Sequence, residues 1–138
     1  DFLAHDNGHL LHTLLGFEGN AHFDPLHIAS NVFIIAGFFL LSSAWSVLHK
    51  AQQTHSLAST GWYARCRHPQ YIAFIIIMFG FLLQWPTIPT LVMFPILLVV
   101  YVRLAKREES IALEEFGDTY RQYMEITPAW IPRLNFKT

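Results

Sequence analysis

Two long stretches without a charged residue constrain this 138-residue chain more than any other feature. No Asp, Glu, Lys or Arg occurs in the 25 residues between Asp24 and Lys50, or in the 35 residues between Arg67 and Arg103. About 20 apolar residues suffice for one helix to cross the hydrocarbon core of a bilayer. The first stretch therefore predicts one spanning helix, and the second is long enough for two short ones.

Prolines divide the second stretch. Pro86 and Pro89 predict a turn, because proline lacks a backbone N–H and clashes with the preceding helical turn. Pro95 predicts a kink within the helix that follows. We expect three spanning helices, at about Leu26–Leu48, Pro69–Trp85 and Thr87–Lys106.

The composition supports a membrane protein. Hydrophobic residues make up 53% of the chain and charged residues 14%, against roughly 45–50% and about 25% in ordinary soluble domains. The alternative is a buried helical hairpin in a water-soluble bundle, but so short a chain cannot bury that many uncharged residues in its own core. We predict one all-α integral membrane domain with about three spanning helices.

The placement of basic residues predicts the orientation. All nine Lys and Arg residues lie between Lys50 and Arg67 or from Arg103 onward. Basic residues accumulate on the cytoplasmic side, so these two regions should be cytoplasmic, in the simplest case at a bacterial inner membrane. The chain begins at Asp1 and not at Met, as expected of a fragment or processed form, so any earlier spanning helices would lie outside it.

Residues 1–25 form a His-rich segment on the predicted extracytoplasmic side. His5, His9 and His12 are spaced to share one face of a helix, and three imidazoles together can bind zinc or copper. The simpler interpretation is an interfacial amphipathic helix whose histidines face the lipid headgroups. We therefore predict no metal site and keep these three histidines as weak candidates.

Several classes of site are excluded or disfavoured. The single Cys66 excludes an internal disulfide and a cysteine-based zinc cluster. Its neighbours Arg65 and Arg67 could lower the thiol pKa, although a small loop residue is the simpler interpretation. The chain has no Gly-rich nucleotide-binding motif and no basic patch interleaved with aromatics, so we expect no nucleic-acid partner.

Polar clusters flank the second uncharged stretch. The segment Gly61–Tyr71 contains two arginines, a histidine and two tyrosines, and ionisable groups at a membrane are costly unless they are paired or used. Glu108 and Glu109 follow the third apolar segment, where the alternative is a solvated helix with surface ion pairs.

The C-terminal part adds two patterns. Phe116, Tyr120 and Tyr123 recur at helical spacing, which predicts packing or anchoring at the membrane interface. The prolines of the segment Thr127–Pro132 exclude a regular helix there. We expect a cytoplasmic helix followed by an extended cap over the cytoplasmic face.

In this order, the motifs resemble the isoprenylcysteine carboxyl methyltransferase and phospholipid methyltransferase family of membrane enzymes. The resemblance covers about Ala51–Arg133 and departs at Ala73, often glycine in the family, and at Leu57-Ala58-Ser59, often Leu-Val-Thr. Some sterol reductases share a similar C-terminal pattern. The motifs are His55-Ser56-Leu57, Thr60-Gly61-Trp62-Tyr63, Arg67-His68-Pro69-Gln70-Tyr71, Glu108-Glu109, Phe116-Gly117 with Tyr120 and Tyr123, and Pro128 with Ile131-Pro132.

The resemblance implies an S-adenosylmethionine site on the cytoplasmic face. Arginine could clamp the cofactor carboxylate, and glutamate could accept hydrogen bonds from its ribose or ammonium. Tyr71 and Trp130 could offer ring faces to the sulfonium or adenine. The implied cofactor-binding residues are His55, Leu57, Gly61, Tyr63, Arg67, His68, Pro69, Tyr71, Glu108 and Glu109. The implied catalytic residues are His68 as donor or base, Glu108, and Arg103 as a holder of an anionic acceptor.

The function that the resemblance implies is methyl transfer by residues 26–138 to a lipophilic or membrane-presented acceptor. This acceptor could be a prenylated protein, a lipid or a small hydrophobic molecule. The His-rich segment has no counterpart in the eukaryotic enzymes that name the family, so the acceptor stays open. Two alternatives remain: a sterol-reductase-like NADPH enzyme and a non-catalytic metal-binding membrane protein.

Overall fold

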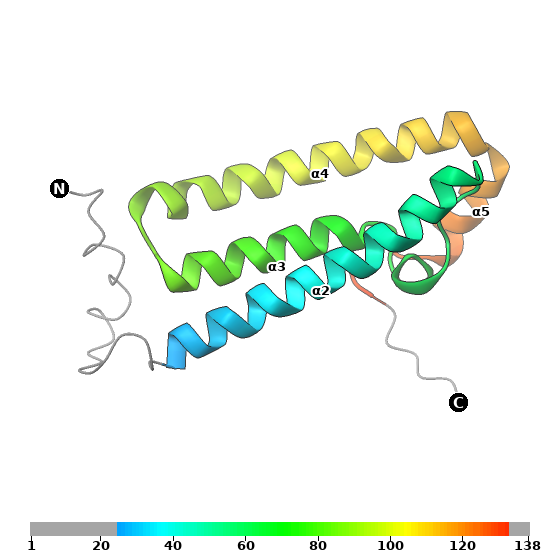
Figure 1. Cartoon of the computed structure of the whole chain (residues 1–138). Helices are drawn as coiled ribbons and strands as arrows, with labels where there is room; N and C mark the ends of the chain where they lie inside the picture. Colours follow the sequence, from blue (N-terminus) through cyan, green and yellow to red (C-terminus); the bar gives the residue numbers. More distant parts are fainter. Residues whose placement is uncertain (1–24, 133–138) are drawn as a thin grey trace.

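The computed structural model describes residues 25–132, and across them the chain is all-helical (Figure 1). In chain order the elements are α2 (Pro25–Gln53), the short 3₁₀ helix η3 (Gly61–Ala64), α3 (Pro69–Gln84), α4 (Ile88–Phe116) and α5 (Asp118–Ile126). Helix α3 packs against both α2 and α4. The three apolar helices lie where the uncharged stretches predict them, and residues 127–132 are non-helical, as the prolines require.

Two predicted helix ends are wrong. The first helix continues beyond Leu48 to Gln53, and the third continues beyond Lys106 to Phe116. The added residues of α4 are mostly good helix formers such as Ala, Leu, Glu and Arg, so the helix ends only at Gly117, whose φ is 56°. Pro95 lies inside α4 without ending it. Glu108 and Glu109 therefore lie on a continuation of an apolar helix.

The apolar side chains face outward. In the most apolar stretches of α2 and α4, only 17% and 6% of the residues are buried. Ile35 and Phe39 of α2 are each 70% exposed. A soluble protein would bury such helices in its core, so this surface requires a hydrocarbon environment. The chain is an all-helical integral membrane protein, and its outward apolar surface argues against the soluble-bundle alternative.

Helix α3 is shorter than α2 and α4. It has 16 residues, whereas a straight span needs about 20. Among the described helices, only α2 and α4 have both the length and the hydropathy of a complete span.

Two glycines bring α2 and α3 close together. A Cβ at Gly37 would lie 2.5 Å from Cγ1 of Ile77, and a Cβ at Gly80 would lie 2.7 Å from Cγ1 of Ile34. Small residues at a contact between membrane helices let the two backbones approach. This contact holds α3 against α2, and the N-terminus of α3 lies toward the end of the bundle where α5 lies (Figure 1).

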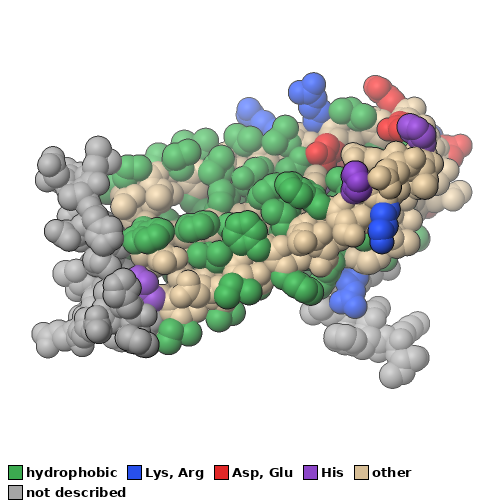
Figure 2. Space-filling view, in the orientation of Figure 1, with side chains coloured by type: hydrophobic (Ala, Val, Ile, Leu, Met, Phe, Trp, Pro, Cys, Tyr) green, Lys and Arg blue, Asp and Glu red, His purple; other side chains and the backbone are tan. Residues whose placement is uncertain are grey.

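Polar side chains gather at one end of the molecule. Figure 2 shows hydrophobic side chains along the bundle and most charged side chains at the end where α5 and residues 54–68 lie. Both regions predicted to be cytoplasmic, Lys50–Arg67 and the part of the chain from Arg103 that the structure describes, contribute to this end. That it faces the cytoplasm stays a prediction.

Candidate active site

A cavity of about 450 Å³ opens at the polar end of the bundle. The end of α2, the loop 54–68, the start of α3, the C-terminal half of α4 and helix α5 all contribute to its wall. The lining residues are Leu48, Ala51, Gln52, His55, Ser56, Leu57, Ala58, Tyr63, Arg67, His68, Gln70, Glu108, Ile111, Ala112, Glu115, Phe116, Tyr120 and Tyr123.

His55 reaches the cavity through a tight helix end. The N–H of Ser56 donates to the carbonyl of Ala51 at 2.9 Å, and the N–H of His55 donates to that of Gln52 at 3.3 Å. His55 itself has a φ of 50°, in the left-handed region. Glycine usually occupies this position after a helix, so the imidazole is held there at a conformational cost.

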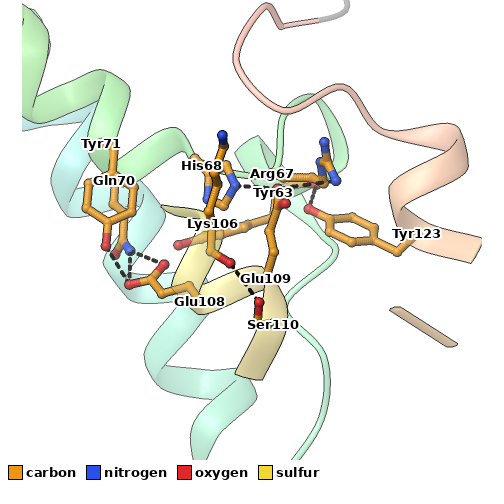
Figure 3. A network of polar contacts seen from close by, with 10 residues as sticks. All are labelled: Tyr63, Arg67, His68, Gln70, Tyr71, Lys106, Glu108, Glu109, Ser110 and Tyr123. Carbon is orange, nitrogen blue, oxygen red and sulfur yellow. Dashed lines mark hydrogen bonds and ion pairs between the residues drawn. The ribbon is translucent and has the colours of Figure 1, made fainter. Parts of the chain in front are cut away.

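Glu109 ties the loop before α3 to α4. Its Oε1 lies 2.8 Å from Nε2 of His68 and 3.2 Å from Nη1 of Arg67 (Figure 3). His68 is buried, and the N–H of Arg67 donates to the carbonyl of Pro128 in the C-terminal cap at 2.9 Å. Glu109 does not line the cavity; it orients two residues that do.

Glu108, the neighbouring carboxylate, has a different environment. It accepts a hydrogen bond from the Tyr71 hydroxyl at 2.6 Å and one from Nε2 of Gln70 at 3.3 Å (Figure 3). It also lines the cavity. The adjacent glutamates therefore divide two roles, with Glu109 bound to the loop and Glu108 oriented at the cavity wall.

Buried hydrogen-bond donors on the cavity wall lack acceptors. Neither the Tyr63 hydroxyl nor Nε of Arg67 has a hydrogen-bond partner among the described residues. Nη1 of Arg67 lies within ion-pair distance of Glu109, but its geometry is not that of a hydrogen bond. Burial raises the pKa of Tyr63, so its hydroxyl stays a donor at neutral pH. Buried polar groups normally have partners, so these donors mark a place for an acceptor group of a ligand.

Cys66 is not activated by its neighbours. It is buried, and burial raises the pKa of its thiol to about 11. Arg65 instead lies over the Trp62 ring, with its guanidinium carbon 5.2 Å from the ring centroid. The pKa lowering that the flanking arginines could have caused is therefore absent, and the thiol is a packed side chain.

The structure brings most of the predicted cofactor-binding residues together. Tyr71 and Glu109 bind residues of the cavity wall without lining it, Pro69 begins α3, and Gly61 begins η3 with a φ of 61°. Those that line the cavity are His55, Leu57, Tyr63, Arg67, His68 and Glu108.

Arg103 lies apart from this group. It is exposed on α4 and is not among the residues that line the cavity. The catalytic role predicted for it finds no geometric support.

Sequence reasoning missed part of the wall. The aromatic stripe was predicted to pack, and Tyr120 and Tyr123 are indeed buried, but these rings and Phe116 also line the cavity. The residues of α4 that follow Glu108 at helical spacing, including Ala112 and Glu115, do the same. The i, i+4, i+7 spacing from Glu108 was the available signal, because such residues share one face.

The described residues give no support for a metal site. Residues 25–132 contain no group of three or more His, Cys, Asp or Glu side chains that could hold a metal ion. The weak candidates His5, His9 and His12 lie outside the described residues.

Fold and cavity together define an integral membrane protein with a polar cavity at one end of an apolar helical bundle. Residues 25–114 match the family described as "Isoprenylcysteine carboxyl methyltransferase (ICMT) family". The chain belongs to this family. The resemblance noted from the motifs is thereby confirmed.

One curated relative is the Protein-S-isoprenylcysteine O-methyltransferase of Schizosaccharomyces pombe. The two are 32% identical over an alignment of 112 positions, and this alignment covers 74% of this chain and 48% of that protein. The chain thus spans about half the length of this relative. No solved structure matches the chain. The family membership favours the methyltransferase interpretation over the reductase and metal-binding alternatives.

Proposed function

We propose that this chain is an S-adenosylmethionine-dependent membrane methyltransferase that acts on a lipophilic or membrane-presented acceptor. The observation that carries the proposal is the cavity itself. The Tyr63 hydroxyl and Nε of Arg67 have no hydrogen-bond partner among the described residues. Both residues line the same cavity as the oriented carboxylate of Glu108, at the polar end of an apolar bundle. The family membership supports the same reaction.

The chemistry of the wall fits the parts of S-adenosylmethionine. Arg67 and Tyr63 suit its carboxylate, because arginine donates charge-assisted hydrogen bonds to such groups. Glu108 suits the ribose hydroxyls or the ammonium, and the ring of Tyr120 or Phe116 suits the adenine or sulfonium. Ligand pockets commonly enclose roughly 300–1,000 Å³, a range that includes this cavity. When bound, S-adenosylmethionine supplies the methyl group carried on its sulfonium.

The chain's own residues contribute positioning. Methyl transfer is an in-line displacement, so orientation and exclusion of water supply most of the rate. Glu109 holds Arg67 and His68, while Tyr71 and Gln70 hold Glu108. If neutral His68 donates from Nε2 to Glu109, its Nδ1 keeps a free lone pair. That nitrogen could accept a proton from a thiol or amine acceptor, whereas a carboxylate acceptor needs no base.

The surroundings of the site favour an acceptor with an apolar part. The cavity lies where the polar end meets the exposed apolar surfaces of α2 and α4. A polar head could react at this boundary while an apolar tail stays in hydrocarbon, where it is most stable. A prenylated cysteine, as in the name of the yeast relative, a phospholipid amine and a small hydrophobic metabolite all meet this description. We place the site on the cytoplasmic face.

A binding titration tests the cofactor. S-Adenosylmethionine and NADPH are titrated separately against the protein in detergent, and we expect binding of the first only. Arg67→Ala should weaken this binding by about 1–3 kcal/mol through the loss of charged hydrogen bonds. Arg121→Ala is the matched control, because Arg121 is exposed and pairs with Asp118 away from the cavity wall. Binding of NADPH without S-adenosylmethionine would support the reductase alternative.

A labelling experiment tests the acceptor class. Membranes that contain the protein are incubated with methyl-labelled S-adenosylmethionine and extracted with organic solvent. We expect the label in the lipid or membrane-protein fraction. Label confined to water-soluble products contradicts the proposal.

A further inference from the structure

We infer that Glu115 makes the cavity selective for a cationic methyl donor over its neutral demethylated product. The inference rests on the proposed function and assigns a role to a residue that the motifs do not include. It follows from the position of Glu115, from the charges around it and from the difference between the two ligands.

Glu115 lines the cavity and has no partner among residues 25–132. It lies seven residues after Glu108 on the same face of α4, which is about 10.5 Å along the axis at 1.5 Å per residue. Glu109 pairs with Arg67 and His68, and Glu108 accepts from Tyr71 and Gln70. Glu115 has no hydrogen bond or ion pair with another described residue. Its charge is therefore available to a ligand.

The other charges of the wall do not cancel it. Among the described residues, the charged lining groups are Arg67, Glu108 and Glu115, with His55 and His68 titratable. Arg67 already faces the carboxylate of Glu109, which lies behind the wall. With neutral histidines the lining carries a formal charge of −1, and the glutamine variant of residue 115 would carry none.

The site around this charge is built for a ligand. Tyr63 is only 6% exposed, lines the same cavity, and its hydroxyl has no partner among the described residues. Nε of Arg67, which has no hydrogen-bond partner among the described residues, belongs to the same wall. Donors thus contribute to the cavity together with an unneutralised carboxylate on α4, an arrangement that suits a ligand with both an anionic and a cationic group.

The two ligands differ in one methyl group and one charge. S-Adenosylmethionine carries a carboxylate, an ammonium and a sulfonium, for a net charge of +1. S-Adenosylhomocysteine carries a neutral thioether instead and has no net charge. A fixed carboxylate attracts the first more strongly than the second. Glu115 therefore favours exchange of the spent product for fresh donor.

The test compares two neighbouring glutamates. Affinities for S-adenosylmethionine and S-adenosylhomocysteine are measured by isothermal titration for the wild type, Glu115→Gln and Glu114→Gln. Glu114 is exposed on the same helix, does not line the cavity and gives the same change in net charge. In Glu115→Gln the donor should bind about 2- to 5-fold more weakly, as expected for a solvent-accessible charge pair. The product should bind as before, and Glu114→Gln should bind both ligands like the wild type.

The salt dependence of binding gives a second check on the role of Glu115. The loss in Glu115→Gln should shrink at high salt, because salt screens exposed charges. Equal weakening of both ligands would overturn the inference, since Glu115 would then contact a group that the two share. Unchanged donor binding would overturn it as well. A wild-type protein that binds neither ligand would refute the proposed function itself, which is a separate result.

Discussion

At the scale of single residues, His55 combines an unfavourable backbone conformation with a place on the cavity wall. A non-glycine residue in the left-handed region costs about 1–2 kcal/mol. Replacing it by glycine removes this cost, but the greater freedom of glycine in the unfolded chain offsets part of the stabilisation. We predict that His55→Gly leaves the free energy of unfolding unchanged or raises it by up to about 1 kcal/mol, while it weakens S-adenosylmethionine binding.

Thermal unfolding and ligand titration in the same detergent measure both effects of this substitution. Asparagine tolerates the left-handed region better than most residues and keeps a hydrogen-bonding side chain, so His55→Asn serves as the control for loss of the imidazole alone. If the His55→Gly variant binds S-adenosylmethionine as tightly as the wild type, the imidazole does not contribute to ligand binding.

The adjacent glutamates should separate stability from binding. Glu109→Gln weakens the pairing of the half-buried Arg67 and the buried His68, so we expect a loss of about 1–3 kcal/mol in the free energy of unfolding. Glu108→Gln should change stability less and ligand affinity directly, because Glu108 lines the cavity. Unfolding curves and titrations of both variants check this. If Glu109→Gln mainly weakened ligand binding and Glu108→Gln mainly lowered stability, the roles assigned to the two glutamates would be wrong.

The Cys66 thiol gives a prediction with a defined pH dependence. Because burial raises its pKa to about 11, the neutral thiol predominates below that pH and few thiolates are present at pH 8. Alkylation by iodoacetamide at pH 8 should therefore be far slower in the folded protein than after denaturation, and it should accelerate as the pH approaches 11. Rapid alkylation of the folded protein at pH 8 would show that the thiol is not buried.

At the scale of helices, the contact between α2 and α3 depends on glycine. A Cβ at Gly80 would lie 2.7 Å from Cγ1 of Ile34 and 3.0 Å from the carbonyl oxygen of Ser30, and a backbone atom cannot easily move aside. We predict that Gly80→Ala costs about 1–3 kcal/mol of stability, the usual range for overpacking. Ala36→Val, at an exposed position of α2, is the control, and thermal unfolding in detergent is the measurement.

The sequence predicts these helices well where one property dominates a long stretch. The uncharged runs located α2, α3 and α4, since a membrane leaves few alternatives to a helix for such a segment. The end of α4 was predicted wrongly because charge marks the membrane boundary, whereas a helix ends only where its bonding is interrupted. Gly117 supplies that interruption ten residues after Arg107.

The candidate site was predictable where residue identity carries the chemistry. The Arg-His-Pro and Glu-Glu motifs indicated the elements that meet, and the structure joins them through His68 and Glu109. The roles within the Glu-Glu pair were not predictable, because they depend on which way each side chain points on α4. The position of Tyr120 on the cavity wall was not predictable for the same reason, because its spacing along the chain is compatible with packing as well as with a cavity wall.

At the scale of the whole molecule, the fold separates two environments. Outward apolar side chains cover α2 and α4, while the cavity, the loop 54–68 and α5 lie at one polar end (Figures 1 and 2). This separation places a polar cavity beside hydrocarbon without requiring a charged group inside the bilayer, where it would be costly. A water-soluble donor and a lipophilic acceptor could thus reach the same cavity from different phases.

The orientation of this polar end is a prediction that labelling can decide. Basic residues concentrate there, at Lys50–Arg67 and from Arg103 onward, so the end should be cytoplasmic. Single cysteines are introduced in a Cys66→Ser background at Gln53, on the polar end, and at Ile88, near the opposite turn. Ile88 is chosen because it is exposed and because a cysteine there leaves intact the side chain of Thr87, which caps α4. In intact cells an impermeant thiol reagent should label residue 88 and not residue 53, and permeabilised cells should show both. Labelling of residue 53 alone from outside would show the opposite orientation, with the polar end outside the cell, because both basic regions share that end.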